Sequence, residues 1–304
     1  MLATEWRRLD DLTMEFTLRQ GVTFHDGSEI TSEDVAFTFG PERMMSPQSR
    51  GYAPSRPFLG TIDRVEATGP HTVRVVTRQS DPLLERRLAG WGAQIIGKKA
   101  FLAAKDWNAW GRTPVGTGPY KVSQLKSGES ILLTAHDAYW ADKPPAASIK
   151  FQIVPEIAAR MAGFAAGDYD PITEVPPDQF KTIARDPDIE VVGGPILNHR
   201  VLLYEKVNPQ LADVHVRRAL SLAIDRQLLV DTFWQGRVEV TRSMQLPSFG
   251  AFYNAERPFP PHDPAKARAE LKLSKYDDTP IPYRVIGSDD DPNAVATAQA
   301  LIGM

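Results

Sequence analysis

The sequence predicts a mixed α/β (α+β) fold with more than one domain. Short alternating apolar runs, typical of half-buried strands, recur along the chain, and apolar residues at helical spacing occur between them. These elements follow no regular β–α alternation and no internal repeat. The 25 prolines favour short elements joined by loops. A chain of 304 residues can bury one large core or about two to three modest ones.

The stretch 16–39 is predicted as strand, tight turn and capped helix. Apolar residues alternate in two short runs before residue 25, which is the period of half-buried strands. His-Asp-Gly at 25–27 has turn chemistry, because Asp can bond its own backbone and Gly accepts positive φ. Thr31 lies where a helix N-cap is expected, with Asp34 three residues later, a pattern close to a capping box.

Further strands and helices are predicted along the rest of the chain. The strands are expected at 62–67, 72–76, 95–96, from 120 onward, 130–134, 149–153, 189–192, 201–204 and 282–286. The helices are expected at 82–90, 98–105, 156–166, 180–184, 213–224, 225–236, 264–273 and 292–304. Asp213, Asp225 and Asp263 are the predicted N-caps of three of these helices, and Gly167 is a predicted helix stop.

Composition and charge exclude several classes of function. The formal net charge is −3 with no basic face, which argues against nucleic acid as a partner. The absence of cysteine excludes thiol catalysis, cysteine metal sites and disulfides. No window approaches the roughly 18 apolar residues of a membrane span. The first six residues do not have the pattern of a secretory signal peptide.

Several motifs, in order, resemble those of one protein family. They are Phe24-His25-Asp26-Gly27 with Ile30-Thr31-Ser32-Glu33-Asp34-Val35, Gly116-Thr117-Gly118-Pro119-Tyr120, Asp137-Ala138-Tyr139-Trp140, Gly167-Asp168-Tyr169-Asp170, Asp213 to Leu220 with Ala223-Ile224-Asp225-Arg226, and Asp263 to Leu271. Together they are similar to the family 5 extracellular solute-binding proteins, the peptide-, nickel- and glycoside-capturing components of ABC importers. Each motif is weak alone, and the resemblance depends on their order over nearly the whole chain.

The resemblance implies a periplasmic-binding-protein-like fold with two lobes and an accessory subdomain, which closes around its ligand by hinge motion. On that pattern residues 1–112 form the accessory subdomain, 113–226 part of the first lobe, and 227–304 the start of an incomplete second lobe. The implied function is capture of di- or oligopeptides for an ABC importer. The implied partners are a short peptide and the permease subunits, the location is the periplasm, and the expected state is a monomer.

No catalytic residue, metal site or cofactor is predicted. His25 and Asp26 could suggest acid/base chemistry, but their place in a turn favours a structural role. The six histidines show no HExxH or other metal-ligand spacing, and no GxSxG nucleophile motif is present. A hydrolase on an α/β scaffold therefore remains a weak alternative, and a binding protein without enzymatic activity is favoured.

Three residues are the candidate ligand contacts. Tyr204, next to the crossing region, is the first choice, because a flat apolar ring with a hydroxyl group suits peptide recognition. Trp91, between two glycines, and Thr117 are weaker choices. Thr117 lies in residues 113–122, a Pro- and Gly-rich stretch expected to cross between the lobes. Ordinary packing or a loop role is at least as plausible for each.

A second hypothesis concerns the ends of the chain. Family members run longer at both ends, so the chain is expected to lack the export signal, the first strand of the first lobe and most of the second lobe. It could then be a truncated or degenerate copy with no binding activity.

Overall fold

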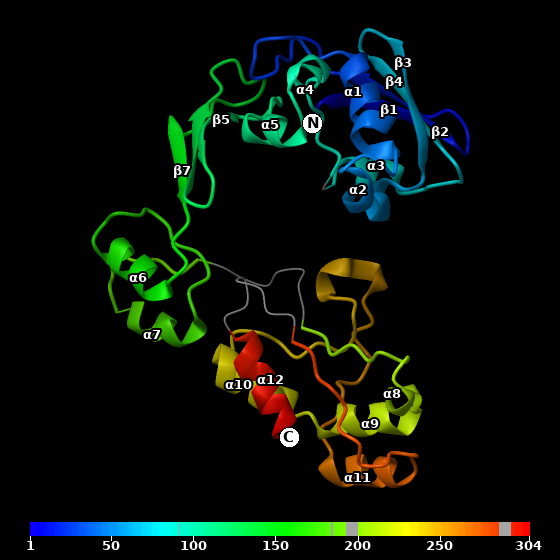
Figure 1. Cartoon of the computed structure of the whole chain (residues 1–304), viewed down its shortest axis with the longest axis vertical. Coiled ribbons are helices and arrows are strands. Elements are labelled where there is room, and N and C mark those ends of the chain that lie inside the picture. The colour runs from blue at the N-terminus through cyan, green and yellow to red at the C-terminus, as the bar shows by residue number, and fades with distance from the viewer. Residues whose placement is uncertain (91, 184, 193–199, 286–292) are drawn as a thin grey trace. The chain divides into compact units, whose positions relative to one another are not determined.

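The computed structural model describes residues 1–90, 92–183, 185–192, 200–285 and 293–304 (Figure 1). The chain divides into two compact units, unit 1 from Met1 to Pro155 and unit 2 from Glu156 to Met304. The runs of alternating apolar residues that form strands lie in the first unit, and most of the helices with an Asp N-cap lie in the second. Each unit is described separately below.

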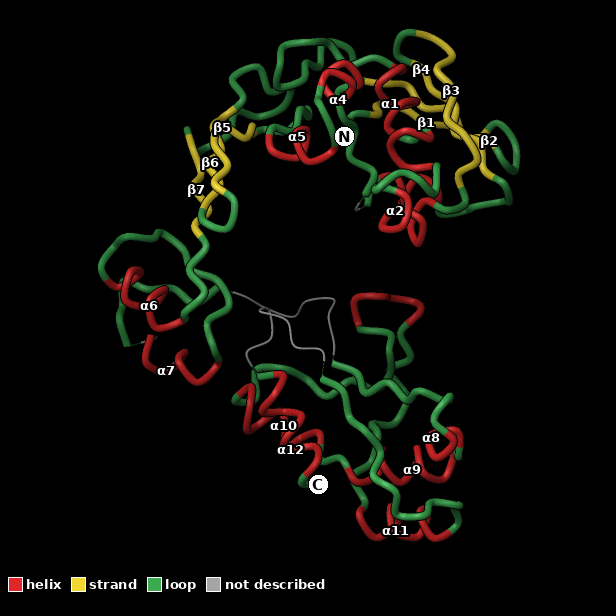
Figure 2. Tube along the Cα trace, in the orientation of Figure 1, coloured by secondary structure: helices red, strands yellow, loops and turns green. Residues whose placement is uncertain are grey.

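Unit 1 holds all the strands found among the described residues (Figure 2). Its strands are β1 (Ala3–Arg8), β2 (Thr13–Leu18), β3 (Ile62–Gly69), β4 (Thr72–Thr77), β5 (Tyr120–Lys126), β6 (Ser130–Ala135) and β7 (Ser148–Gln152). Its helices are α1 (Ser32–Thr38), the short π-helix η1 (Pro41–Met45), α2 (Tyr52–Leu59), α3 (Leu84–Leu88), α4 (Lys98–Ala103) and α5 (Trp107–Arg112).

The first sheet of unit 1 has four antiparallel strands in the order β1-β2-β4-β3. Its register places Phe16 opposite Val73 and Met14 opposite Val75, and all four side chains are buried. The alternation of apolar residues thus puts one face of β2 and β4 into a common core. Helix α1 packs against β3 and β4, and its Val35 joins the same core.

The predicted strand, turn and capped helix of residues 16–39 are largely confirmed. The backbone N–H of Thr31 donates to Asp34 Oδ2 at 2.9 Å, completing the capping box that starts α1. The second predicted run, at 22–24, was wrong as a strand, because it forms only an isolated bridge between Thr23 and Glu29. Its apolar residues Val22 and Phe24 are nevertheless fully buried, in a small second core.

The second sheet of unit 1 has three antiparallel strands in the order β5-β6-β7. It begins within the predicted crossing segment, residues 113–122, and belongs to the same compact unit as the first sheet. Contact density therefore places the division of the chain at residue 155. The lobe boundaries predicted near residues 112 and 226 stay predictions.

The described residues of unit 2 contain helices and loops. The helices are α6 (Ile157–Ala165), the 3-10 helix η2 (Pro177–Gln179), α7 (Phe180–Ile183), α8 (Pro209–Ala212), α9 (Val214–Ala223), α10 (Arg226–Trp234), the 3-10 helix η3 (Pro247–Phe252), α11 (Pro264–Lys272) and α12 (Ala294–Ile302). The predicted N-caps are confirmed, since Asp213, Asp225 and Asp263 each accept a bond from a backbone N–H in the first turn of α9, α10 and α11.

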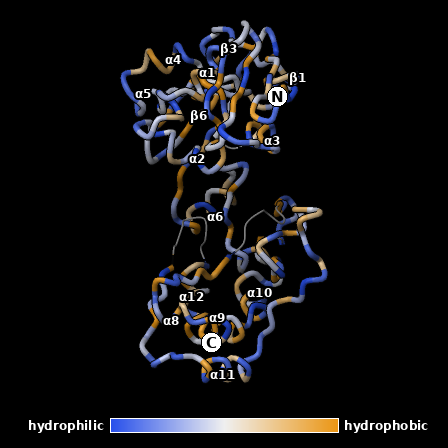
Figure 3. Tube along the Cα trace, turned by 90° about the vertical axis from the view of Figure 1, so that its right-hand side faces the viewer, coloured by the Kyte–Doolittle hydropathy of each residue, from blue (hydrophilic) through white to orange (hydrophobic). Residues whose placement is uncertain are grey.

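Helices α9 and α11 pack against each other and form much of the core of unit 2. Their buried residues include Val216, Ala219, Leu222 and Ala267. Figure 3 shows orange, apolar stretches alternating with blue, hydrophilic ones in the region of α9 and α11. His215 Nδ1 and Glu270 Oε2, 2.7 Å apart, add a polar link between the two helices.

Several predicted strands do not form. Residues 189–192, 201–204 and 282–285 have no strand pairing, residue 286 lies outside the described residues, and residues 95–96 form a loop. An alternating run becomes a strand only where a neighbouring strand completes its hydrogen bonds. Residues 201–204 still alternate between exposed and half-buried side chains: Leu203 is 79% exposed, whereas Tyr204 is half-buried.

Candidate functional site

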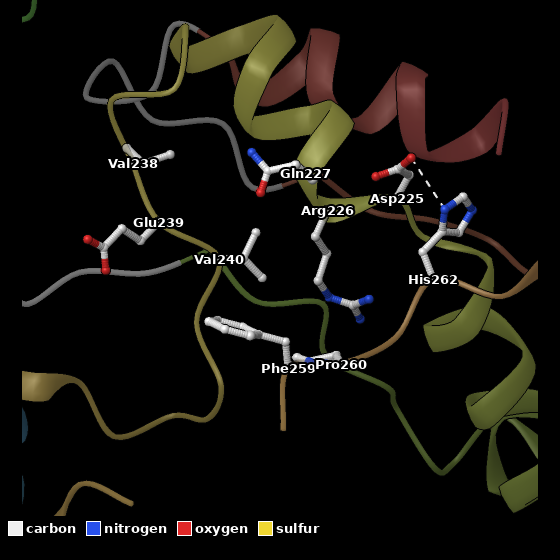
Figure 4. Close-up of a pocket in the computed structure, with 9 residues that line it drawn as sticks. All are labelled: Asp225, Arg226, Gln227, Val238, Glu239, Val240, Phe259, Pro260 and His262. Carbon is white, nitrogen blue, oxygen red and sulfur yellow. Dashed lines mark ion pairs between the residues drawn. The ribbon is translucent and has the colours of Figure 1, made fainter. Parts of the chain in front are cut away.

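A pocket of about 440 Å³ opens in unit 2 at the start of α10 (Figure 4). Its size falls within the range of small-molecule sites. It is lined by Asp225, Arg226, Gln227, Val238, Glu239, Val240, Phe259, Pro260 and His262. The lining therefore combines a cation, two carboxylates and an apolar wall. That combination can bind a ligand that carries both charges and a carbon skeleton.

Arg226 is held in place by its own segment of the chain. Its Nη1 donates to the carbonyl oxygens of Ser221 at 3.0 Å and Ile224 at 3.3 Å, and its Nη2 donates to Ser221 Oγ at 3.1 Å. Figure 4 shows the side chain extending from the start of α10 toward Phe259 and Pro260. Burial lowers the pKa of the Arg226 guanidinium, which still remains charged at neutral pH.

Asp225, at the edge of the pocket, makes two contacts through its two carboxylate oxygens. Its Oδ1 accepts from the Leu228 N–H at 2.9 Å, which caps α10 and fixes where that helix begins. Its Oδ2 lies 3.3 Å from His262 Nδ1 (Figure 4). The cap thus connects the start of α10 to the segment before α11, and this connection forms one side of the pocket.

Tyr204, the first candidate from the sequence, lies beside this pocket rather than in its lining. Burial raises the pKa of the Tyr204 phenol, while the Arg226 and Arg217 charges act in the opposite direction. Both guanidinium groups are therefore close to the tyrosine. Arg217 is anchored by the carbonyl oxygens of Leu211 at 2.7 Å and Ala212 at 2.8 Å.

Thr117, the second candidate, belongs to unit 1 and has a defined backbone role. Its carbonyl oxygen accepts from Trp140 Nε1 at 3.1 Å. Two flanking glycines bond to His25: the Gly116 N–H donates to Nδ1 at 3.3 Å, which leaves Nε2 to donate to the Gly118 oxygen at 3.1 Å. His25 is thereby engaged in holding the crossing segment. The third candidate, Trp91, lies outside the described residues.

Sequence reasoning missed Arg226, Glu239, Phe259 and His262 as members of one pocket. Arg226 carried a signal, because it follows a predicted N-cap and ends one of the family-like motifs. The other three lie in loops whose spacing gives no indication of a common site. Only the folding of the loops after α10 and before α11 brings them together.

Two further properties bear on function. Among the residues that the structure describes, no group of three or more His, Asp or Glu side chains is placed to hold a metal ion. In the same part of the chain, no helix combines the length and the apolar character needed to cross a membrane.

Comparison with known proteins gives consistent matches along the chain. The chain is 28% identical to heme-binding protein A of Haemophilus influenzae, in a match that covers 90% of the chain. It is 29% identical to the dipeptide-binding protein of Escherichia coli, in a match that covers 89% of the chain. It spans about half the length of these curated relatives, 53% and 54%.

The fold is likewise that of known periplasmic binding proteins. The solved structure of DppA from Helicobacter pylori in complex with the peptide STSA matches with a TM-score of 0.83 at 22% identity. The match covers 100% of this chain and 62% of DppA. The mixed α/β, periplasmic-binding-protein-like fold expected from the sequence is therefore confirmed.

The family itself is shown by a match over residues 1–304, the full chain, to the family described as bacterial extracellular solute-binding proteins, family 5 Middle. Members of this family are solute-binding proteins of ABC transporters, found in the periplasm or outside the cell, rather than enzymes. The chain belongs to the family 5 bacterial extracellular solute-binding proteins.

Proposed function

We propose that the protein captures short peptides for an ABC importer. The observation that carries this proposal is the family match over residues 1–304, together with the peptide-binding relatives. On this proposal the chain acts as a monomer in the periplasm, does no chemistry, and delivers its ligand to permease subunits after closure of the lobes.

The pocket at α10 supports a zwitterionic ligand. A short peptide carries a carboxylate at one end and an ammonium group at the other. Arg226 offers a fixed positive charge, and Glu239 offers a carboxylate in the same pocket. Val240 and Phe259 supply apolar surface for a side chain. Tyr204, Thr117 and Trp91 remain our proposed ligand contacts from the sequence, and Tyr204 lies beside this pocket.

The test is ligand-dependent unfolding of the full 304-residue chain. A peptide present at one hundred times its dissociation constant should raise the free energy of unfolding by about 2.7 kcal/mol. Separate samples receive heme and a nickel–histidine complex, because one relative is a heme-binding protein and the similar solved structure of NikZ from Campylobacter jejuni is in complex with Ni(L-His). If only heme or only the nickel complex raises the free energy of unfolding, that ligand and not a peptide is the solute. If none of the three raises it, the proposal is contradicted.

Variants then locate the site by calorimetric titration with the best peptide. Arg226→Lys keeps the charge but loses the planar fork, so we expect affinity to fall about tenfold. Tyr204→Phe removes only a hydroxyl group and should cost about fivefold if that group contacts the ligand. Arg237→Lys is the matched control, because Arg237 stacks on Phe180 and does not line the pocket. Unchanged affinity in Arg226→Lys would place the peptide elsewhere.

A further inference from the structure

Arg43 is a partly buried cation without a carboxylate partner among the described residues. It lies in η1, and its Cζ stands 4.9 Å from the ring centre of Trp107 and 5.8 Å from that of Trp110. Burial lowers the pKa of the Arg43 guanidinium, and no acidic side chain in the described part of the chain opposes that effect. Arg43 thus loses part of its hydration, and no carboxylate among the described residues compensates for that loss.

Two hydrogen-bond donors at this place also lack acceptors. Arg43 Nε and Trp110 Nε1 are both closed to solvent, and neither has a partner among the described residues. Both can only donate. Buried donors of this kind are rare in folded proteins and call for an acceptor. The group that completes the cluster therefore has to bring oxygen atoms, and a negative charge would also balance the guanidinium.

The cluster is held by packing on several sides. Phe101 meets Trp107 at 5.1 Å and Trp110 at 5.4 Å between ring centres, and Phe37 of α1 supports Phe101 at 5.5 Å. These contacts hold the two indole rings that lie beside the Arg43 guanidinium.

A glycine on the neighbouring loop leaves room for the guanidinium. A Cβ at Gly51 would stand 2.8 Å from Arg43 Nη1 and would collide with the Arg43 carbonyl oxygen. The position of Arg43 thus depends on a glycine at residue 51 as well as on the two tryptophans.

We propose that Arg43, Trp107 and Trp110 form a binding site for an oxyanion, either a carboxylate or a phosphate. The N–H groups of a guanidinium lie in its own plane, where two oxygens of one anion accept from Nε and Nη. Trp110 Nε1 supplies a third donor. This site lies wholly in unit 1, and it does not rest on the proposed peptide function.

The competing explanation is a cation–π contact that only holds η1 and α5 together. The two explanations differ in their response to anions. Sodium acetate and sodium phosphate are titrated into the full chain against sodium chloride at constant ionic strength, with tryptophan emission and the thermal midpoint as readouts. We expect one of the two oxyanions to give a saturable emission change and a higher midpoint, and the stronger of them identifies the source.

Three variants assign the response. Trp110→Phe keeps the ring but removes one donor, so we expect affinity to fall about fivefold. Arg43→Lys keeps the charge but loses Nε–H and the planar set of donors, so we expect a fall of about tenfold or more. Arg56→Lys is the matched control: Arg56 also stacks on an aromatic ring, that of Tyr52 at 5.5 Å, but it donates to the Tyr52 hydroxyl at 2.9 Å. Its affinity should remain within about twofold of wild type.

The outcomes separate clearly. A response no different from that in chloride overturns the site, since a water molecule or the cation–π contact alone then completes the cluster. A saturable response that Trp110→Phe and Arg43→Lys leave unchanged also overturns it. If Arg43→Lys does not fold, as judged by circular dichroism, Trp110→Phe decides the outcome.

Discussion

Asp81 is a buried carboxylate, 3% exposed, with donors on both oxygens. Thr61 Oγ1 donates to Oδ2 at 2.7 Å, Arg87 Nε lies 3.1 Å from Oδ2, and the Leu83 N–H donates to Oδ1 at 3.0 Å. Burial alone would raise the pKa of Asp81, but these donors outweigh it and hold the pKa below its ordinary value of 3.8.

A carboxyl whose pKa is lowered by folding contributes stability above its ordinary pKa and loses that contribution as the pH falls through the lowered value. We therefore expect the free energy of unfolding of unit 1 to decline below about pH 4. Asp81→Asn should cost about 1–3 kcal/mol at pH 7 and flatten that decline. Urea unfolding between pH 2 and 7 measures both effects.

The control is Asp63→Asn, because Asp63 is 42% exposed at its side chain and pairs with Arg64 and Arg78 on the surface. Its change in the free energy of unfolding should stay within about 1 kcal/mol. An acid decline of equal slope in wild type and Asp81→Asn would contradict the role given to Asp81.

Gly163, inside α6, makes room for the ring of Tyr169. A Cβ at this position would collide with Tyr169 Cε2 and stand 3.1 Å from Cδ2. Gly163→Ala should therefore destabilise unit 2 by about 1–3 kcal/mol, although alanine favours helix. Gly111 in α5 has nothing within 4 Å, so Gly111→Ala should stabilise by about 0.5–1 kcal/mol. Urea midpoints that move the same way in both variants would contradict the steric argument.

At the scale of elements, two N-cap residues of unit 2 differ in whether they also bind a second segment of the chain. Among the described residues, Asp263 Oδ1 accepts from the Lys266 N–H alone, at 2.9 Å, within the first turn of α11. Asp213 accepts from the His215 N–H at 2.8 Å through Oδ1 and from the Lys275 N–H at 3.1 Å through Oδ2. The second bond ties the start of α9 to the segment that follows α11.

We therefore expect Asp213→Ala to lower the urea midpoint of unit 2 more than Asp263→Ala does. Loss of the single cap at Asp263 should cost about 1 kcal/mol. The Asn variant at each position restores a side-chain acceptor and should recover most of the loss. Equal losses in the two alanine variants would show that the bond to Lys275 contributes little.

The elements that sequence predicted well depend on local signals. A capping box, an Asp before a helix and a stop such as Gly167, with its φ of +79°, are set by residues within one turn of each other. Residues 201–204 have the alternation of a strand, but pairing requires a distant partner that sequence periodicity cannot supply.

The candidate site shows the same limit. Tyr204 was singled out by its residue chemistry, and Arg226 carried only the signal of ending a family-like motif. Phe259 and His262 join the pocket only through loop packing. The division at residue 155 is likewise not readable from the sequence, because the density of contacts in three dimensions decides it.

At the scale of the whole molecule, the two units bury very different cores. Of the ten largest fully buried side chains among the described residues, nine lie in unit 1, and Val216 is the one from unit 2. Four of the other buried apolar residues of unit 2 are alanines: Ala219, Ala267, Ala294 and Ala298. Buried apolar area is the main favourable contribution to folding, so unit 1 should be the more stable of the two.

We accordingly expect calorimetry of the full chain to show two transitions, with unit 2 unfolding first. Gly163→Ala should lower only the first midpoint, and Asp81→Asn only the second, because each change acts within one unit. A fragment of residues 1–155 should unfold cooperatively near the second midpoint. One transition that both variants shift equally would mean that the units fold as a single cooperative body, and the smaller core of unit 2 would then be stabilised through unit 1.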